Sequence, residues 1–428
     1  LAAAVTQTSG SVETNTSSVL TLVPDSATPL NVTAVFVPTG ASLLPASVSG
    51  SLALTAAGSP WLATGDIYVP SNTVLTAEPG VEILMPERAS IYVHGRLCLA
   101  GTPDAPVRVG PNTNLSAIAR LYTDPALADA TDKAYRWGGI VFDRADHEGV
   151  LSNVVIRGAT LAANDCINMK AAVSAFGSDL FMWGLDIAGS DFPIFVQEGH
   201  STVLENSRIF IDVVGDGINI KRAAYARVEG CEFSSANLTA DTDAIDYDGI
   251  QGGVIRNNHI HDFMGDNNDA IDIGEGTLDL LVEGNLIERC YDKAVSIGQA
   301  STAVVRRNVI RDVGMGLGIK DTGSYGLIEH NTFRDVTHAV AVYEKNLGKG
   351  GGAADVRNCI VSHAKDAPFT CDALSSLSVS HTLCDTEAVP GTGNRFAEPQ
   401  FLRPSQGNFA LKTGSAAIDS GDPASGLD

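Results

Sequence analysis

The chain has 428 residues, of which 44% are hydrophobic and 18% charged, and its formal net charge is −22. This negative charge argues against nucleic acid and anionic membrane surfaces as partners. The sequence contains no apolar run of about 18 residues or more, so no membrane-spanning segment is predicted.

Taken in chain order, the sequence divides into three parts. Residues 1–58 are rich in Ala, Ser, Thr and Val and are interpreted as a β-rich segment or linker. From Trp61 short apolar runs alternate with turn residues. We assign residues 59–400 to one continuous stack of short strands, a parallel β-helix. Residues 401–428 are assigned as a closing segment. Residues 111–136 interrupt the pattern and are expected to form a loop, with a short helix, over a binding face.

One pattern recurs from residue 201 onward, with a period of about 23–28 residues. Each repeat opens with a run such as Leu281-Val282-Glu283-Gly284-Asn285 and closes with a run such as Ala270-Ile271-Asp272-Ile273. Alternation with period two predicts strands, and no helical stretch separates them. The sequence therefore predicts an all-β solenoid, a single-stranded parallel β-helix.

Two columns of residues keep the same phase in successive repeats. The first column is small or amide-bearing: Ser207, Cys231, Asn258, Asn285, Asn308, Asn331 and Cys359. Asparagines stacked about 4.8 Å apart can hydrogen-bond to one another inside a coil. The second column, two residues earlier, is charged and mostly alternates in sign: Glu205, Glu229, Arg256, Glu283, Arg306, Glu329 and Arg357. Strict alternation would place both columns on one face, so we expect the chain to turn between them.

The closing runs carry the candidate site. Just before them stand Asp216, Asp243, Asp269, Lys293, Met315 and His338. Three residues later stand Asn219, Asp246, Asp272, Ser296, Gly318 and Ala341. Two residues further stand Lys221, Asp248, Gly274, Gly298, Lys320 and Tyr343. Alternation directs the last two columns outward. Asp243 and Asp269 stand at the preceding turn, where alternation leaves their direction open. If they also point outward, five carboxylates crowd two adjacent coils: Asp243, Asp246, Asp248, Asp269 and Asp272.

Like charges this close must be compensated. Three outcomes stay open: a Ca²⁺ site of oxygen ligands, an acid–base pair that shares a proton, or neutralisation by Lys221 and Lys293. The candidate catalytic residues are Asp243, Asp246, Asp269, Asp272 and Lys293. The candidate substrate-binding residues are Lys221, Arg222, Lys320 and Tyr343. The candidate metal ligands are Asp248, Asp266 and Asn268. The sequence has no fingerprint for an organic cofactor, so none is expected.

Residues 59–400 resemble right-handed parallel β-helix proteins of the pectate-lyase-like superfold, including the bacterial right-handed β-helix repeat family. The resemblance implies a right-handed coil, a secreted or cell-surface location and a polysaccharide partner. It implies processing by a lyase, C5-epimerase or glycoside hydrolase on the outer strand face. The alternative is a non-catalytic structural or adhesive module of a larger protein, because this fold hosts both classes. A monomer is expected.

A second, more distant resemblance is to polygalacturonase-type hydrolases. Those enzymes carry Asn-Thr-Asp, Asp-Asp, Gly-His-Gly and Arg-Ile-Lys motifs on successive coils. This chain has Asp241-Thr242-Asp243, Asn268-Asp269, Lys293 and Gly318-Ile319-Lys320 in similar order. The resemblance implies acid and base roles for Asp243 and Asp269. This chain departs from the motifs at three positions, where Asn268 replaces the first Asp of the pair, Lys293 replaces the His and Gly318 replaces the Arg.

Overall fold

The computed structural model describes residues 40–112, 136–159, 171–212, 215–236 and 241–425, with the backbone of four strands before residue 40. Those four strands form two antiparallel pairs, β1 (Ala2–Thr6) with β4 (Thr33–Val37) and β2 (Ser11–Thr14) with β3 (Leu20–Val23). The loop predicted at residues 111–136 lies outside the described residues except at its ends.

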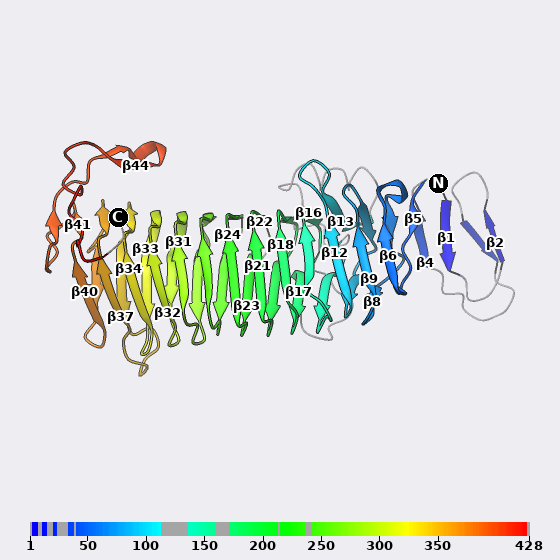
Figure 1. Ribbon diagram of the computed structural model, residues 1–428, viewed down its shortest axis with the longest axis horizontal. Helices are drawn as coiled ribbons and strands as arrows, with labels where there is room; N and C mark the ends of the chain where they lie inside the picture. The colour runs from blue at the N-terminus through cyan, green and yellow to red at the C-terminus, as the bar shows by residue number, and fades with distance from the viewer. Residues whose placement is uncertain are drawn as a thin grey trace.

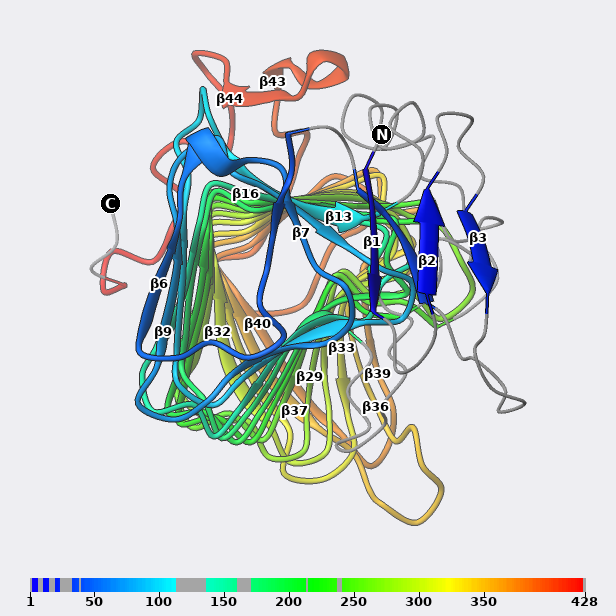
Figure 2. The ribbon, with the colours of Figure 1, turned by 90° about the vertical axis from the view of Figure 1, so that its right-hand side faces the viewer.

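Short strands stack in parallel along one axis, coil upon coil (Figure 1). The view along the axis shows the coils superimposed (Figure 2). Each full coil carries three strands, and each strand pairs in parallel with its counterpart one coil away. The predicted all-β, right-handed parallel β-helix is confirmed. In the described residues no helix is long and apolar enough to cross a membrane.

The first strands of the coils form a 13-stranded sheet. They are β6 (Ser51–Leu54), β9 (Val74–Ala77), β12 (Arg96–Ala100), β15 (Gly149–Ser152), β18 (Leu180–Trp183), β21 (Ser201–Glu205), β24 (Tyr225–Glu229), β27 (Gly253–Arg256), β30 (Leu280–Glu283), β32 (Thr302–Arg306), β34 (Tyr325–Glu329), β37 (Ala353–Arg357) and β40 (Ser376–Ser380).

The second and third strands together form a 25-stranded sheet. The second strands, with β5 before them, are β5 (Ser42–Leu43), β7 (Trp61–Leu62), β10 (Glu82–Met85), β13 (Val107–Pro111), β16 (Val154–Arg157), β19 (Asp186–Ala188), β22 (Arg208–Ile211), β25 (Glu232–Ser235), β28 (His259–Phe263), β35 (Thr332–Arg334), β38 (Ile360–Ser362), β41 (Leu383–Cys384) and β42 (Arg395–Phe396).

The third strands carry the candidate site. They are β8 (Ile67–Val69), β11 (Ser90–Val93), β14 (Gly139–Asp143), β17 (Ala171–Phe176), β20 (Phe192–Gln197), β23 (Ile218–Lys221), β26 (Ile245–Asp248), β29 (Ile271–Gly274), β36 (His338–Tyr343) and β39 (Phe369–Cys371). Two long strands, β31 (Leu286–Ile297) and β33 (Val309–Lys320), serve as second and third strand at once.

The stack begins before residue 59, because β5 pairs with β7 and β6 with β9. A single 3₁₀ turn, η1 (Ala56–Gly58), separates them from the following coils. At the other end the hairpin of β43 (Phe401–Arg403) and β44 (Asn408–Leu411) encloses a second such turn, η4 (Pro404–Gln406), and pairs with no coil.

The chain does turn between the two phased columns. The intervening residue has a positive φ in each of the seven repeats: Asn206, Gly230, Asn257, Gly284, Arg307, His330 and Asn358. A left-handed residue at this point reverses the alternation, so the charged side chain faces out and the next column faces in.

The buried column forms the predicted asparagine ladder. Nδ2 of Asn258, Asn285 and Asn308 donates to Oδ1 of the asparagine one coil on, over 2.9–3.0 Å. The same Oδ1 atoms accept backbone N–H groups, so each amide is satisfied inside the coil.

The charged column forms the predicted ion pairs across neighbouring first strands. Arg256 pairs with Glu229, and Arg357 pairs with Glu329, each at 2.8 Å. Arg306 pairs with Glu283 at 2.8 Å in the same way. Glu205 departs from the pattern, because its neighbour in the column is the like-charged Glu229, and it pairs instead with Arg227 from outside the column at 2.7 Å. Partly exposed surface pairs of this kind each stabilise the fold by about 1 kcal/mol or less.

Candidate functional site

The third strands set the direction of the candidate residues. Ile245 and Tyr247 are fully buried in the core, and so are Ile271 and Ile273 one coil later. The alternating positions therefore face outward, where Asp246 lies opposite Asp272 in the parallel register. Neighbouring strands are about 4.8 Å apart, which brings these two carboxylates side by side.

A second row of carboxylates lies where the third strands begin. Oδ1 of Asp216 accepts the backbone N–H of Asp243 at 3.0 Å, and Oδ1 of Asp243 accepts that of Asp269 at 2.7 Å. Oδ1 of Asp269 then accepts the N–H of Lys293 at 3.1 Å. Each carboxylate thus binds the backbone of the next coil, which fixes the row beside Asp246 and Asp272.

Three lysines from the same face pair with this cluster. Nζ of Lys221 lies 2.5 Å from Oδ2 of Asp248. Nζ of Lys293, which is 3% exposed, lies 3.1 Å from Oδ1 of Asp269 and also contacts Asp292.

The third lysine reaches across two coils. Nζ of Lys320 lies 3.6 Å from Oδ1 of Asp272. Lysine neutralisation, one of the three outcomes left open by the sequence, is therefore present for Asp248, Asp269 and Asp272.

The compensation is incomplete at Asp246 and Asp243. Burial, followed by the charges of Asp216, Asp248 and Asp272, raises the pKa of Asp246 to about 9. Burial and the charge of Asp269 raise the pKa of Asp243 well above its usual range. Burial raises the pKa of Asp269 to about 7, although the charge of Lys293 opposes this rise. At neutral pH the cluster therefore holds protons.

Some buried polar atoms beside the cluster have no hydrogen-bond partner among the described residues. One is Oγ of Ser296, which lies opposite Asp272 one coil on. Asn219 donates through Nδ2 to Asp216 and Asp246, while its Oδ1 is buried and unpaired. Buried polar atoms without partners are costly to the folded state.

The structure brings most of the predicted site residues together. Asp243, Asp246, Asp269, Asp272 and Lys293 form the cluster, with Lys221, Asp248 and Lys320 at its edge. Tyr343 lies on the same face, two coils beyond Lys293. Their catalytic and binding roles stay predictions.

Other candidates lie apart from the cluster. Arg222 is exposed at the strand end and pairs with Glu198 at 3.1 Å. Asp266 is exposed in the loop before Asp269. Asn268 is buried, and its Oδ1 accepts the backbone N–H of Thr242 at 3.1 Å.

The proposed metal ligands are accordingly committed elsewhere or separated, because Asp248 also pairs with Lys221. Within the described ranges no set of three acidic, His or Cys side chains is arranged to hold a metal ion. Calcium binding stays a prediction.

Asp216, Asn219 and Asp292 belong to the cluster but were not among the predicted site residues. Asp216 was detectable, because it occupies the same repeat position as Asp243 and Asp269. Asn219 likewise shares a column with Asp246. Asp292 carried no such signal, since a register irregularity between Cys290 and Lys293 displaces it from the columns.

Several solved structures are similar to this chain at the level of the fold. The periplasmic alginate epimerase AlgG shows 11% identity and a TM-score of 0.38, with 76% of each chain covered. The catalytic domain of a GH87 alpha-1,3-glucanase in complex with nigerose shows 14% identity and a TM-score of 0.40, covering 86% of this chain and 70% of that one. The A-module of the Azotobacter vinelandii mannuronan C-5 epimerase AlgE6 shows 14% identity and a TM-score of 0.32, covering 82% and 92%.

No curated protein is significantly similar to this chain. A family model described as a right handed beta helix region matches residues 216–383. This match falls within the stacked coils and spans the acidic cluster, so the family model and the structure agree that the chain carries a right-handed parallel β-helix.

Proposed function

We propose that the chain is a carbohydrate-active enzyme that hydrolyses glycosidic bonds of a polysaccharide on the face of its third strands. The observation that carries the proposal is the Asp246–Asp272 pair on adjacent coils. One member has a pKa raised to about 9, so it is protonated at neutral pH, and the other is held by Lys320. Glycoside hydrolysis needs one carboxylic acid and one carboxylate flanking the same bond.

The roles follow from the two environments. Asp246 donates its proton to the glycosidic oxygen as the bond to the leaving sugar breaks. Asp272 attacks the anomeric carbon, and water then releases the sugar with Asp246 acting as base. Because adjacent strands are about 4.8 Å apart, the pair fits the spacing of roughly 5–5.5 Å typical of retaining enzymes.

The state of the lysines supports hydrolysis over lyase or epimerase chemistry. Those reactions act on uronates and need a cation to neutralise the sugar carboxylate. Lys221, Lys293 and Lys320 are each already paired with aspartates. The aspartates of the cluster also outnumber the lysines, which disfavours an acidic glycan. We also propose that the protein acts outside the cell or at its surface, where polysaccharides are met.

The test is a panel of neutral and acidic polysaccharides, assayed for new reducing ends and for the absorbance of unsaturated products. Reducing ends without unsaturated product are expected on a neutral glycan, with retention of anomeric configuration by NMR. Asp246→Asn and Asp272→Asn should each lower kcat by a factor of about 10² or more. Asp355→Asn, at an exposed site on the 13-stranded sheet, should have no effect.

Unsaturated products would replace the hydrolase with a lyase. Binding without turnover across the whole panel would favour the non-catalytic surface module instead.

A further inference from the structure

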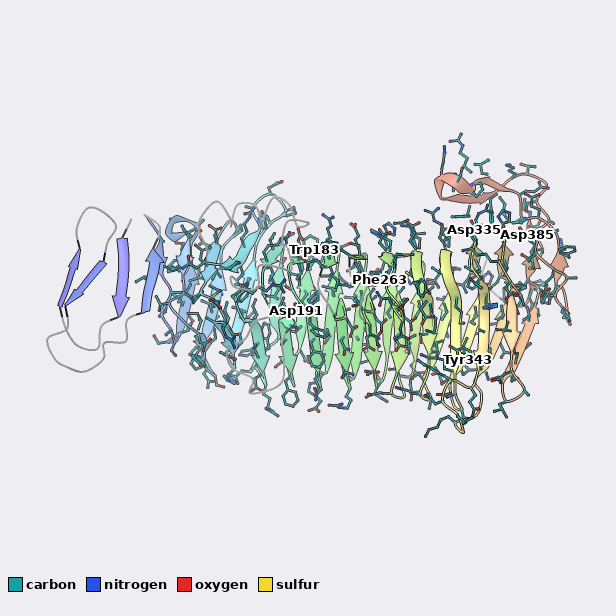
Figure 3. The ribbon with its side chains drawn as sticks, turned by 180° about the vertical axis from the view of Figure 1, so that it is seen from behind. Trp183, Asp191, Phe263, Asp335, Tyr343 and Asp385 are labelled. Carbon is teal, nitrogen blue, oxygen red and sulfur yellow. The ribbon has the colours of Figure 1, made fainter. Side chains whose placement is uncertain are left out.

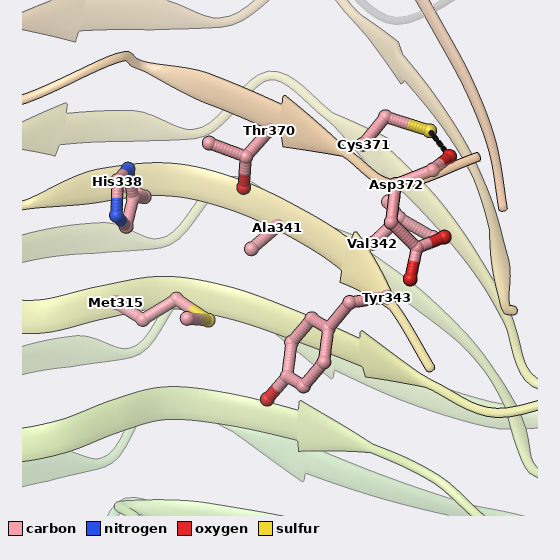
Figure 4. A pocket seen from close by; sticks show the side chains of 8 residues that line it. All are labelled: Met315, His338, Ala341, Val342, Tyr343, Thr370, Cys371 and Asp372. Atoms are coloured by element: carbon pink, nitrogen blue, oxygen red, sulfur yellow. Dashed lines mark hydrogen bonds between the residues drawn. The ribbon is translucent and has the colours of Figure 1, made fainter. Parts of the chain in front are cut away.

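A pocket of about 430 Å³ lies on the third strands, C-terminal to the acidic cluster (Figure 4). It is formed by β33, β36 and β39, and the side chains around it are Met315, His338, Ala341, Val342, Tyr343, Thr370, Cys371 and Asp372. Figure 3 marks Tyr343 on the C-terminal half of the stack. The proposed acid and nucleophile, Asp246 and Asp272, do not line this pocket.

The floor of the pocket continues the outward column that carries Asp246 and Asp272. The next members of that column are Ser296, Gly318, Ala341 and Thr370. At Ala341 and Thr370 the small side chains line the pocket, whereas Ser296 is fully buried and Gly318 lies beneath the side chains of Lys293 and Met315. The cluster and the pocket therefore lie in one line along the helix axis, with the side chains of Lys293 and Met315 between them.

Larger side chains border this floor on both sides. Lys293, Met315 and His338 are aligned on one side in the parallel register. Lys320 and Tyr343 are aligned on the other. Tyr343 is half-buried, and its ring supplies a flat apolar surface, which is the side-chain type that packs against a sugar ring.

His338 offers a directed polar group. Its Nδ1 lies 2.7 Å from the carbonyl oxygen of Ala367 and donates to it. In the neutral ring, Nε2 is then the acceptor available to a ligand hydroxyl.

Tyr343 connects the pocket electrostatically to the cluster. Burial raises the pKa of its hydroxyl, and the charges of Lys293, Asp292 and Asp269 also act on it. In Figure 4 this hydroxyl points away from Thr370, toward the coils of the cluster.

The lining carries no Lys or Arg, and its one carboxylate is ionised. Asp372 accepts the backbone N–H of Glu344 at 2.7 Å and that of Leu374 at 3.0 Å, and these bonds lower its pKa. An ionised carboxylate accepts hydrogen bonds from hydroxyl groups but repels a uronate.

From this alignment and chemistry, we propose that the pocket is a binding subsite for neutral sugar units of a glycan that lies along the helix axis, over the side chains of Lys293 and Met315. The glycan runs from the Asp246–Asp272 pair to Thr370. The inference rests on the proposed function for what happens at the cluster, but sugar binding in the pocket is measurable without turnover.

The free, exposed thiol of Cys371 provides a direct readout. The full chain carrying Asp246→Asn is alkylated in the presence of short neutral oligosaccharides of glucose, mannose or galactose, with oligogalacturonate as the charged probe. The rate at Cys371 is read from its peptide by mass spectrometry. At least one neutral sugar is expected to slow it several-fold, while the rate at Cys98, in β12 of the other sheet, stays unchanged as internal control.

Variants separate binding in the pocket from binding elsewhere. Tyr343→Ala should abolish the protection of Cys371, and His338→Ala should weaken it about tenfold. Tyr225→Ala, at an exposed tyrosine of the 13-stranded sheet, should leave it intact. Circular dichroism and the melting temperature check that each variant is folded.

The outcomes for the two proposals differ. Turnover of a neutral glycan without protection of Cys371 would leave the proposed hydrolysis standing and overturn the subsite. Protection without turnover on any substrate would support the subsite and overturn the hydrolase. Failure of every neutral sugar to protect Cys371, or stronger protection by oligogalacturonate, would overturn the subsite.

Discussion

The ammonium group of Lys320 lies 3.6 Å from Oδ1 of Asp272, although the two residues are separated by a whole coil. The coil between them carries Gly298, where a Cβ would lie 3.0 Å from Cε of Lys320. The missing side chain at this position lets the lysine lie across the intermediate coil. Asp272 is therefore paired with a residue more than 40 positions further along the sequence.

Gly298→Ala should disturb this contact, because the added methyl group meets the lysine chain. We expect a loss of about 1 kcal/mol or less of unfolding free energy, similar to Lys320→Met, since the pair is only partly buried. The two changes should not add in the double variant, because each removes the same contact. Denaturant unfolding of the four proteins measures this, and full additivity would show that Gly298 does not serve the Lys320–Asp272 pair.

The strand periodicity was enough to predict the coils, the buried asparagine column and the outward columns, since one register repeats throughout. It could not give the direction of Asp243 and Asp269, because these residues precede the strand where alternation begins. In the structure each of these carboxylates accepts a hydrogen bond from a backbone N–H of the next coil, and this contact fixes the direction of the side chain. The contact between Lys320 and Asp272 could not be predicted from the sequence either. It spans two coils and depends on the absence of a side chain at Gly298 in the coil between them.

The raised pKa values predict that the fold is more stable in mild acid than in mild base. Asp246, with a folded pKa of about 9, and Asp269, with one of about 7, keep protons that the unfolded chain releases near pH 4. The free energy of unfolding should therefore fall as pH rises from about 5 to about 8. Thermal melting across this range measures the effect.

Asp246→Asn is the matched variant for this pH dependence. The neutral amide removes the proton uptake at that site, so its melting temperature should depend less on pH and exceed that of the parent protein at about pH 8. Asp262, whose pKa is lowered to about 2 by Arg289, titrates below this window and does not mask the effect. A parent melting temperature that is flat or rises between these pH values would contradict the protonated cluster.

Lys293→Met should destabilise the protein most at and above neutral pH. The buried ammonium group offsets Asp269 and Asp292, and removing one partner of a buried pair costs about 3 kcal/mol or more. Stability should recover as pH falls, because Asp269 then takes up a proton. The double variant Lys293→Met/Asp269→Asn should regain most of the lost unfolding free energy. A loss independent of pH would point to packing rather than charge.

Lys221→Met is the comparison variant. It breaks a more exposed pair and should lower the unfolding free energy by about 1 kcal/mol or less.

Asn285→Leu tests the register on which the whole arrangement depends. Oδ1 of Asn285 accepts both the backbone N–H and Nδ2 of Asn258, and its Nδ2 donates to Asn308 and to the carbonyl of Ile255. Leucine has a similar size but supplies none of these partners, so buried groups on two coils lose hydrogen bonds. Each such group costs about 1–3 kcal/mol, and we expect the unfolding free energy measured with denaturant to fall by about 2 kcal/mol or more.

Asn257→Gly is the control for Asn285→Leu. It changes the left-handed turn residue just before the ladder and should change the unfolding free energy by about 0.5 kcal/mol or less. Equal effects of the two substitutions would mean that the ladder does not stabilise the stack.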